Sequence, residues 1–333
     1  MFVKVTMGII PSNSDFSLTE AQKSQFLEHG FVKIPQCFTR DQAAEFTSTL
    51  WTRLGMDPND KETWTAERTN MPWHRHIPVS EFAPKAWAAM CELLGGEERI
   101  SDSPEFRGWS DGFIVNLGKD EYSSDDDLDL RSLDGWHNDG DFFVHFLDSP
   151  EQALLVIPLW SDIESKGGGT AICGEGIKHI AKHLYDHPEG TNPWMRSTLD
   201  PTHSTYEGRE YWQSLAWDKS KIPDSAFQEA TGEIGDVYLL HPLMLHSVSR
   251  NLLRIPRVIT NPPVSLKEPF CFDREDESRY SLVEKKTLRD LGMEGGLKGW
   301  KITSERKPWV SERIRKVEEM KRLELERLGG MSK

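Results

Sequence analysis

The chain has few cysteines and lacks any long apolar run. Its 333 residues include only four cysteines, which are widely separated and form no Cys-x-x-Cys pair (Cys37, Cys91, Cys173 and Cys271). This spacing excludes a zinc ribbon or a disulfide framework and predicts reduced thiols. The longest apolar runs, such as 153–160, are far shorter than the roughly 20 residues of a membrane-spanning helix. Residues 1–11 have no small-residue cleavage site of a signal peptide. We therefore expect a soluble cytoplasmic protein without a membrane partner.

Positive charge is also scarce. The chain has 40 Lys and Arg residues against 54 Asp and Glu residues, for a formal net charge of −14. Such a charge repels the phosphates of nucleic acids unless basic residues are segregated on one surface. The only basic cluster lies in the charged C-terminal segment. We therefore expect no nucleic-acid partner. The length of the chain is enough for a substantial core, and we expect a monomer or homodimer.

Three helices are predicted before residue 110. A Ser-x-x-Glu pattern at Ser17 and a Thr-x-x-Gln pattern at Thr39 have the form of capping boxes. The first predicts a helix that ends near Gly30 and leads into a strand over 31–35. The second predicts a helix that runs to Gly55. Apolar residues at helical spacing predict a third helix over 80–95.

From about residue 110 to residue 265 the pattern changes to short strands. Runs rich in aromatic and branched residues are separated by Gly- and Pro-containing turns (112–117, 142–147, 153–160, 237–240 and 257–260). A helix over 177–187 interrupts them. The expected fold is α+β with a mainly β core. This core would be a double-stranded β-helix, the cupin-like jelly roll, flanked by N-terminal and C-terminal helices.

The chain divides into three predicted parts: an irregular N-terminal extension over 1–16, a single domain over 17–303, and a charged C-terminal helix over 304–333. Two segments of the domain have the character of insertions. The acidic run 123–134 is typical of a solvated loop, although its position before His137 also allows a lid. The segment 189–230 carries several tryptophans and either walls a pocket or pads the core.

The strongest local signal is the pair His137 and Asp139. Residues i and i+2 at a strand end point to the same side and can grip one metal ion together. A turn and an apolar strand over 235–246 then deliver a further histidine, His246, with His241 as an alternative. Two histidines and one carboxylate are the ligands of the facial triad of non-heme iron oxygenases, which leaves three coordination positions open. His137, Asp139 and His246 are therefore candidate catalytic metal ligands.

An arginine close to the last histidine is a candidate anchor for an anionic co-substrate. Arg257 opens an apolar strand, and its planar guanidinium suits a carboxylate in a partly buried pocket. Arg254 is the alternative, but it lies in a turn, where a solvated arginine is the ordinary expectation. The residues alone favour Arg257 without excluding Arg254.

These features together resemble the phytanoyl-CoA dioxygenase (phytanoyl-CoA hydroxylase) family of iron(II)- and 2-oxoglutarate-dependent oxygenases. The likeness runs through most of the chain and is carried by five motifs: Gly30-Phe-Val-Lys-Ile-Pro35, Trp136-His-Asn-Asp139, Leu159-Trp-Ser-Asp162, Gly167-Gly-Gly-Thr170 and the segment from Gly235 to His246. The arginine eleven residues after His246 matches the 2-oxoglutarate-binding arginine of that family. The resemblance thus selects His246 over His241 and Arg257 over Arg254.

The resemblance implies a non-heme iron dioxygenase with Fe(II), 2-oxoglutarate and dioxygen. Such an enzyme oxidises a C–H bond of a small molecule, here an amino acid or secondary metabolite, by hydroxylation, desaturation or oxidative cyclisation. It also implies that Thr170 and Trp160 line the co-substrate pocket, with Asn116 as a further candidate. The carboxylate of Asp139 argues against a halogenase, in which a small residue frees that coordination position.

Two positions depart from the family pattern. Cys173-Gly-Glu-Gly stands where a Pro-Gly-Ser-His-like loop is expected, and Val248 stands where some relatives present a hydroxyl. These departures leave open a non-catalytic jelly-roll binding protein, and the ligand set alone would also suit a cupin-type zinc hydrolase. Separately, His74-Arg-His76 is interpreted as a surface that could receive an anionic substrate rather than as a second metal site.

Overall fold

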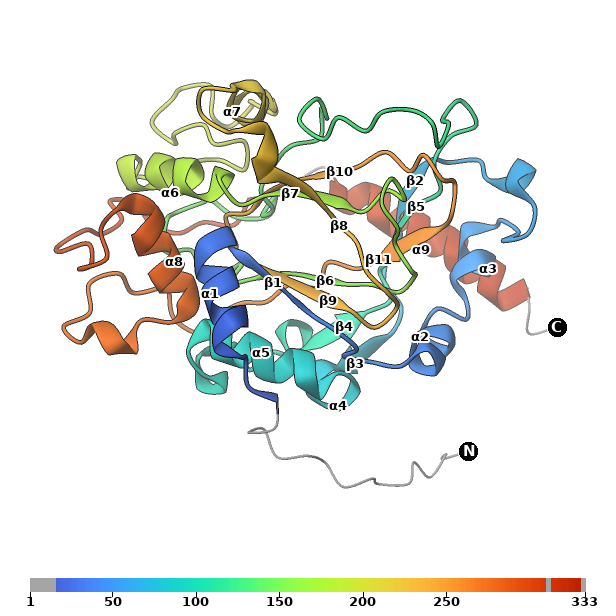
Figure 1. Cartoon of the computed structure of the whole chain (residues 1–333), viewed down its shortest axis with the longest axis horizontal. Helices are drawn as coiled ribbons and strands as arrows, with labels where there is room; N and C mark the ends of the chain where they lie inside the picture. The colour runs from blue at the N-terminus through green and yellow to red at the C-terminus, as the bar shows by residue number, and fades with distance from the viewer. Residues whose placement is uncertain (1–15, 310–312, 331–333) are drawn as a thin grey trace.

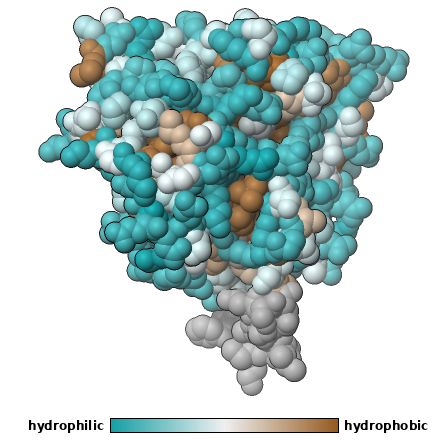
Figure 2. Space-filling model, turned by 60° about the vertical axis from the view of Figure 1, so that its left-hand side comes forward, coloured by the Kyte–Doolittle hydropathy of each residue, from teal (hydrophilic) through white to brown (hydrophobic). Residues whose placement is uncertain are grey.

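The computed structural model describes residues 16–309 and 313–330 of the chain (Figure 1). The predicted N-terminal extension therefore lies outside the described residues, apart from Phe16. No helix in the described ranges is long and apolar enough to cross a membrane. The surface in Figure 2 is mainly hydrophilic, with small separate apolar patches. All four cysteines are free, as their spacing predicted.

The N-terminal helices begin and end at residues with clear capping chemistry. Helix α1 (Glu20–His29) has its capping box at Thr19 and Gln22, not at Ser17 as predicted, and ends at Gly30 in the left-handed region. The Thr39 capping box is confirmed, but it opens only a short helix, α2 (Arg40–Phe46), which is separated from α3 (Leu50–Leu54). Residues 47–49, Thr-Ser-Thr, separate the two helices. Serine and threonine have a low propensity for helix interiors.

The third predicted helix is also divided. Helix α4 (Val79–Phe82) ends at Ala83, and α5 (Pro84–Leu94) begins with Pro84. A proline has no N–H to continue the preceding helix, whereas it suits the first turn of the next one. The later helices are α6 (Gly176–Asp186), α7 (Glu210–Trp217), α8 (Leu282–Leu291) and α9 (Arg313–Gly330). Helix α8 starts with a capping box of Ser281 and Glu284.

The strands form small antiparallel sheets, which we group into two arrays and a separate strand pair. In the first array, the sheet β1-β9-β6 is joined to β11-β5-β2 by an isolated bridge between Leu159 and Ile259. The second array is β10-β7-β8, and β3 pairs with β4 separately. The bounds are β1 (Phe31–Ile34), β2 (Arg68–Asn70), β3 (His76–Pro78), β4 (Gly108–Ser110), β5 (Ile114–Asn116), β6 (Leu155–Pro158), β7 (Thr170–Cys173), β8 (Phe227–Ala230), β9 (Val237–Leu240), β10 (Leu245–Val248) and β11 (Arg257–Ile259).

The arrays lie one above the other in Figure 1, with β7, β8 and β10 above β1, β6 and β9, with α4 and α5 below and α1 to the left. The fold is therefore mixed, with helices around small antiparallel sheets. Within residues 16–309 and 313–330 the strands do not close into a continuous barrel. The predicted strand over 142–147 is replaced by isolated bridges from Phe143 and His145 to distant segments. The core collects side chains from both arrays and from the helices.

His241, the rival of His246 in the sequence, is a fully buried structural residue. Its Nδ1 accepts the N–H of Leu243 at 3.1 Å, and its Nε2–H donates to the Thr287 hydroxyl on α8 at 2.9 Å. Burial, assisted by the charge of Lys286, lowers the pKa of His241 to about 3. The ring is therefore neutral in the folded protein, and protonation would break the bond from Leu243.

We predict that His241 makes the protein less stable in mild acid. The unfolded histidine has a pKa near 6.5, so below that pH the unfolded chain takes up a proton that the folded chain refuses. The contribution of His241 to stability is therefore complete above about pH 6.5 and is lost as the pH falls towards 3. Between pH 7.5 and 5.0 the loss should be about 2 kcal/mol. Urea unfolding of the His241→Asn variant should show a smaller loss over this range, and an equal loss in both proteins would contradict the prediction.

Candidate metal centre

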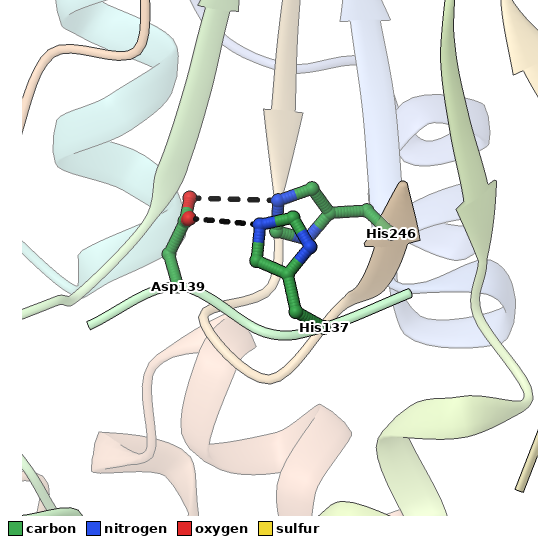
Figure 3. Close-up of side chains that lie close together, drawn as sticks. All are labelled: His137, Asp139 and His246. Atoms are coloured by element: carbon green, nitrogen blue, oxygen red, sulfur yellow. Dashed lines mark ion pairs between the residues drawn. The ribbon is translucent and has the colours of Figure 1, made fainter. Parts of the chain in front are cut away.

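His137, Asp139 and His246 lie together although they are far apart in the sequence (Figure 3). His137 and His246 form an antiparallel bridge, with two N–H···O bonds of 2.9 Å between their backbones. His137 Nε2 lies 3.5 Å from one carboxylate oxygen of Asp139, and His246 Nε2 lies 3.6 Å from the other. One ligand atom from each residue falls within 4.8 Å of the others. The three side chains can therefore share one metal ion.

Backbone carbonyls fix both imidazoles in the tautomer that a metal requires. The Nδ1–H of His137 donates to the carbonyl of Gly135 at 2.7 Å, and that of His246 donates to the carbonyl of Met244 at 3.0 Å. Each ring therefore offers its Nε2 lone pair towards Asp139. Such bonds to the other ring nitrogen orient ligating histidines and raise their basicity.

The charge of Asp139 is balanced by its neighbours. Burial alone would raise the pKa of Asp139, but the two imidazoles outweigh it and hold the pKa well below its usual range. The carboxylate oxygen that faces His246 also accepts the side-chain amide N–H of Asn261 at 2.7 Å. Asp139 is therefore an oriented anion, which is the state that a divalent cation binds.

The ligands face a large cavity. It has a volume of about 880 Å³, and all three ligands line it together with Arg257 and Thr170. Its apolar floor consists of side chains from the first strand array and from β10 (Leu155, Ile157, Ile259 and Val248). The cavity is large enough to hold small molecules beside a metal ion.

Arg257 is buried in this cavity without an acidic partner. Its guanidinium donates to the carbonyls of Gly168 and Ile114 at 2.7 and 3.2 Å. Among the described residues, no carboxylate lies within 4.0 Å of it. Burial together with the charge of Arg68 lowers the pKa of Arg257 to about 10, and the charge of the more distant Glu229 offsets this only in part. Arg254, the alternative, instead forms an ion pair with Asp120. A buried arginine without a direct ion pair is costly and fits a site for an anion.

The other predicted pocket residues have different positions. Thr170 lines the cavity and pairs in the sheet with Val248. Trp160, which was predicted to line the co-substrate pocket, is absent from the cavity lining; it lies two residues after the end of β6 and stacks on Phe46 with ring centroids 4.7 Å apart. Within β6, Leu155 and Ile157 take the cavity side.

Asn116 and the segment 72–76 also lie outside the cavity lining. The Asn116 amide donates to the carbonyl of Ser249 at 2.9 Å and accepts the N–H of Gly118 at 3.2 Å, so it holds a turn. His74 pairs with Glu324 on α9, and Arg75 pairs with Asp111. These two residues therefore tie the C-terminal helix and a loop to the domain. The segment that was predicted to receive an anionic substrate lies outside the cavity of the ligands.

Several residues around the ligands were missed as functional candidates. Asn261 follows Arg257 and Ile259 at a spacing of two, so the strand alternation could have pointed to it. Asn138 lies between the two ligands and is almost fully buried. Its side chain accepts the indole N–H of Trp212 at 2.9 Å and faces Nδ1 of His145 at 3.5 Å. No sequence pattern indicated this contact, since α7 lies far along the chain from the ligand pair.

Helix α7 contacts the segment that carries His137 and Asp139 at three points. Besides the bond from Trp212, Arg209 at the helix N-cap donates to the carbonyl of Gly135 at 2.9 Å, and Gln213 donates to that of Asp134 at 3.2 Å. The three residues lie on one helix face. The 189–230 segment therefore supports the ligand pair directly.

We predict that the Trp212→Phe substitution weakens metal binding. Phenylalanine keeps an aromatic ring but leaves the buried oxygen of Asn138 without its donor. Loss of a bond that orients ligating residues lowers metal affinity by about tenfold or more. Competition titrations with Ni²⁺ would measure this change. Trp217→Phe, on the exposed side of the same helix, is the matched control, and equal affinities of the two variants would refute the role of Trp212.

The site thus defines a class of protein: one with a two-histidine, one-carboxylate metal centre that opens into a cavity with a buried arginine. No protein-family model matches the sequence, and no curated protein sequence matches it either. Solved structures with some similarity include HygX from Streptomyces hygroscopicus with nickel, 2-oxoglutarate and hygromycin B bound. It is 15% identical, with a TM-score of 0.38 over 75% of this chain and 88% of that chain.

Two further structures come from nogalamycin biosynthesis. The non-heme α-ketoglutarate-dependent carbocyclase SnoK is 14% identical, with a TM-score of 0.42 over 78% of this chain and 87% of that chain. The epimerase SnoN, in complex with Fe³⁺, α-ketoglutarate and nogalamycin RO, is 12% identical, with a TM-score of 0.37 over 88% of this chain and 96% of that chain. Similarity at this level assigns neither an activity nor a substrate, so the function proposed below rests on the side chains of the site.

Proposed function

We propose that this chain is an iron(II)- and 2-oxoglutarate-dependent oxygenase that oxidises a C–H bond of a small molecule. The observation that carries the proposal is the shared cavity of the three ligands and Arg257. A metal site alone would suit several chemistries. A buried arginine without a carboxylate partner, on the wall of the same cavity, supplies the second half of a site for a chelating dicarboxylate.

The residues present fit an iron(II) ion. Two imidazoles and one carboxylate are the donor set of the facial triad, and three ligands leave positions for other molecules. His137, Asp139 and His246 would hold the ion, and Asn261 would keep the Asp139 carboxylate turned towards His246. When bound, iron with 2-oxoglutarate and dioxygen supplies the oxidising power for attack on a C–H bond.

The residues also fit 2-oxoglutarate. Arg257 would pair with the carboxylate remote from the metal, because a guanidinium offers two parallel N–H donors to one carboxylate. Thr170 would present its hydroxyl from the neighbouring strand β7. Leu155, Ile157 and Ile259 would shield the carbon chain from water. Val248 faces the same cavity without a hydroxyl, so Thr170 is the polar neighbour in this part of the pocket.

The architecture supports a fold of the jelly-roll kind and a place in the phytanoyl-CoA dioxygenase family. Two antiparallel arrays enclose the site, and the last ligand and the arginine come from the consecutive strands β10 and β11. The substrate would be a small molecule such as an amino acid or secondary metabolite. Hydroxylation, desaturation or oxidative cyclisation would all begin with removal of a hydrogen atom from carbon.

The proposal is tested by anaerobic spectroscopy of the iron-loaded protein. Addition of 2-oxoglutarate should produce the metal-to-ligand charge-transfer absorption of a chelated 2-oxo acid, and admission of dioxygen should release succinate. His137→Ala should lose both signals. Iron-loaded protein that binds no 2-oxoglutarate would instead support a non-catalytic binding protein. Hydrolytic activity with zinc and no absorption with iron would support a hydrolase.

A further inference from the structure

The 189–230 segment forms one part of the cavity lining and contributes both apolar and charged side chains to it. Five residues of this segment line the cavity: Pro193, Trp194, Arg209, Trp212 and Gln213. Trp212 and Gln213 use their donors on the ligand segment, as described above. Pro193 and Trp194 add apolar surface. Arg209 is the one positive charge that this segment contributes to the lining.

Arg209 has spare hydrogen-bonding capacity. An arginine has five N–H donors, and Arg209 places one nitrogen, Nη1, on the carbonyl of Gly135. Within the described part of the chain, no carboxylate lies within 4.0 Å of its guanidinium, whereas Arg68, which also lines the cavity, faces Glu67 at 3.3 Å. Of the three arginines that line the cavity, the exposed Arg209 and the buried Arg257 thus have no described carboxylate within 4.0 Å.

Arg209 lies close to the metal ligands, so an anion bound to its guanidinium would lie close to them too. The carbonyl oxygen of Gly135 accepts both the Nη1–H of Arg209 and the Nδ1–H of His137. One shared acceptor therefore separates the guanidinium from a ligand imidazole. A molecule held by Arg209 would therefore lie in the same cavity as His137 and close to that ligand.

The surrounding charges favour a single negative charge over a double one. Asp134 and Asp141 line the same cavity, and the whole chain has a net charge of −14. Both would repel a phosphate ester more strongly than a carboxylate. The planar guanidinium also matches a carboxylate in a bidentate arrangement.

We propose that Arg209 binds the carboxylate of the primary substrate, and that Pro193 and Trp194 pack against the apolar body of that molecule. This inference rests on the proposed function and narrows the substrate class to small monocarboxylates oxidised near the carboxylate. Arg257 and Arg209 would then divide the cavity into a co-substrate end and a substrate end.

The test measures binding rather than turnover. Protein loaded with Ni²⁺ and saturating 2-oxoglutarate is titrated by calorimetry with four carboxylates and their primary amides: phenylacetate, indole-3-acetate, L-leucine and L-tryptophan. At least one carboxylate should bind about tenfold more tightly than its amide, as expected for a charge-assisted contact. Arg209→Gln should abolish this preference, and Arg209→Lys should restore part of it. Arg289→Gln, an exposed arginine on α8 outside the cavity lining, should leave it unchanged.

The outcomes separate this inference from the proposed function. No preference for any carboxylate, an unchanged preference in Arg209→Gln, or tighter binding of phenyl phosphate than of phenylacetate would each overturn the role of Arg209. Binding of 2-oxoglutarate in the same samples would show that the proposed function survives that result. A carboxylate preference that persists when 2-oxoglutarate itself fails to bind would instead overturn the proposed function alone.

Discussion

Replacing Arg257 by leucine should remove most of the affinity for 2-oxoglutarate while the metal still binds. Leucine fills part of the space but leaves the carboxylate of the co-substrate without its cation in a buried site. Truncation of one partner of a buried, hydrogen-bonded charge pair costs about 2–5 kcal/mol, which corresponds to an increase in Kd of at least about thirtyfold. Calorimetry with the Ni²⁺-loaded protein would give the affinities for metal and 2-oxoglutarate separately.

Two further variants make the Arg257 experiment specific. Arg257→Lys keeps the charge but loses the planar fork, so its affinity should lie between those of the leucine variant and the unmodified protein. Arg254→Ala removes the rival arginine, which pairs with Asp120 at the surface, and should bind 2-oxoglutarate normally. If Arg254→Ala lost affinity and Arg257→Leu did not, the assignment of the arginine would be wrong.

Removal of the Glu324 side chain should strongly destabilise the protein. Glu324 on α9 accepts a bond from Nε of Arg53 at 2.9 Å and lies 2.9 Å from Nε2 of His74, and both Arg53 and Glu324 are almost fully buried. Asp111 also contacts Arg53 at 3.1 Å. Breaking a buried pair from one side leaves part of a charge uncompensated, at a cost of about 3–5 kcal/mol. Urea unfolding of Glu324→Ala should show a loss of this size.

The same helix offers a matched control. Glu326 lies on the exposed side of α9 and pairs with Arg322 at 2.5 Å. Exposed pairs on a helix contribute only about 0.3–0.5 kcal/mol, so Glu326→Ala should be nearly neutral. Similar losses in both variants would mean that the buried position of Glu324 does not matter. Intermediate stability of Glu324→Gln would show that hydrogen bonding replaces part of the charge.

The sequence was most informative where short-range chemistry decides the structure. The capping pattern at Thr39 produced the expected helix start, and Gly30 and Gly55 end helices in the left-handed region. Errors arose where two local signals compete. At the first helix, Ser17 and Thr19 both offer capping hydroxyls, and the structure uses the pair Thr19 and Gln22. The breaks at Thr47 and Pro84 are likewise local effects that the apolar periodicity concealed.

The candidate site was predicted only in part, because local spacing indicates some of its residues and contacts between distant segments place the others. His137 and Asp139 are two residues apart, and this spacing alone indicated a common target, although the structure has only an isolated bridge at His137 and no strand there. His246 and Arg257 lie on consecutive strands, and family resemblance selected them. Trp160 lies just beyond β6 and packs on Phe46, a contact with a distant segment that no local pattern predicts. The hydrogen bonds from α7 to the ligand segment join distant parts of the chain, and no local sequence pattern predicts them.

The backbone bridge between His137 and His246 has a consequence for how the protein acquires its metal. The two ligands come from segments separated by most of the strand region, and contacts of such long sequence separation form late and slowly. A metal ion that needs both imidazoles would find its full set of ligands only after this closure. Metal uptake should therefore report completed folding, and an excess of metal should slow unfolding more than it speeds refolding.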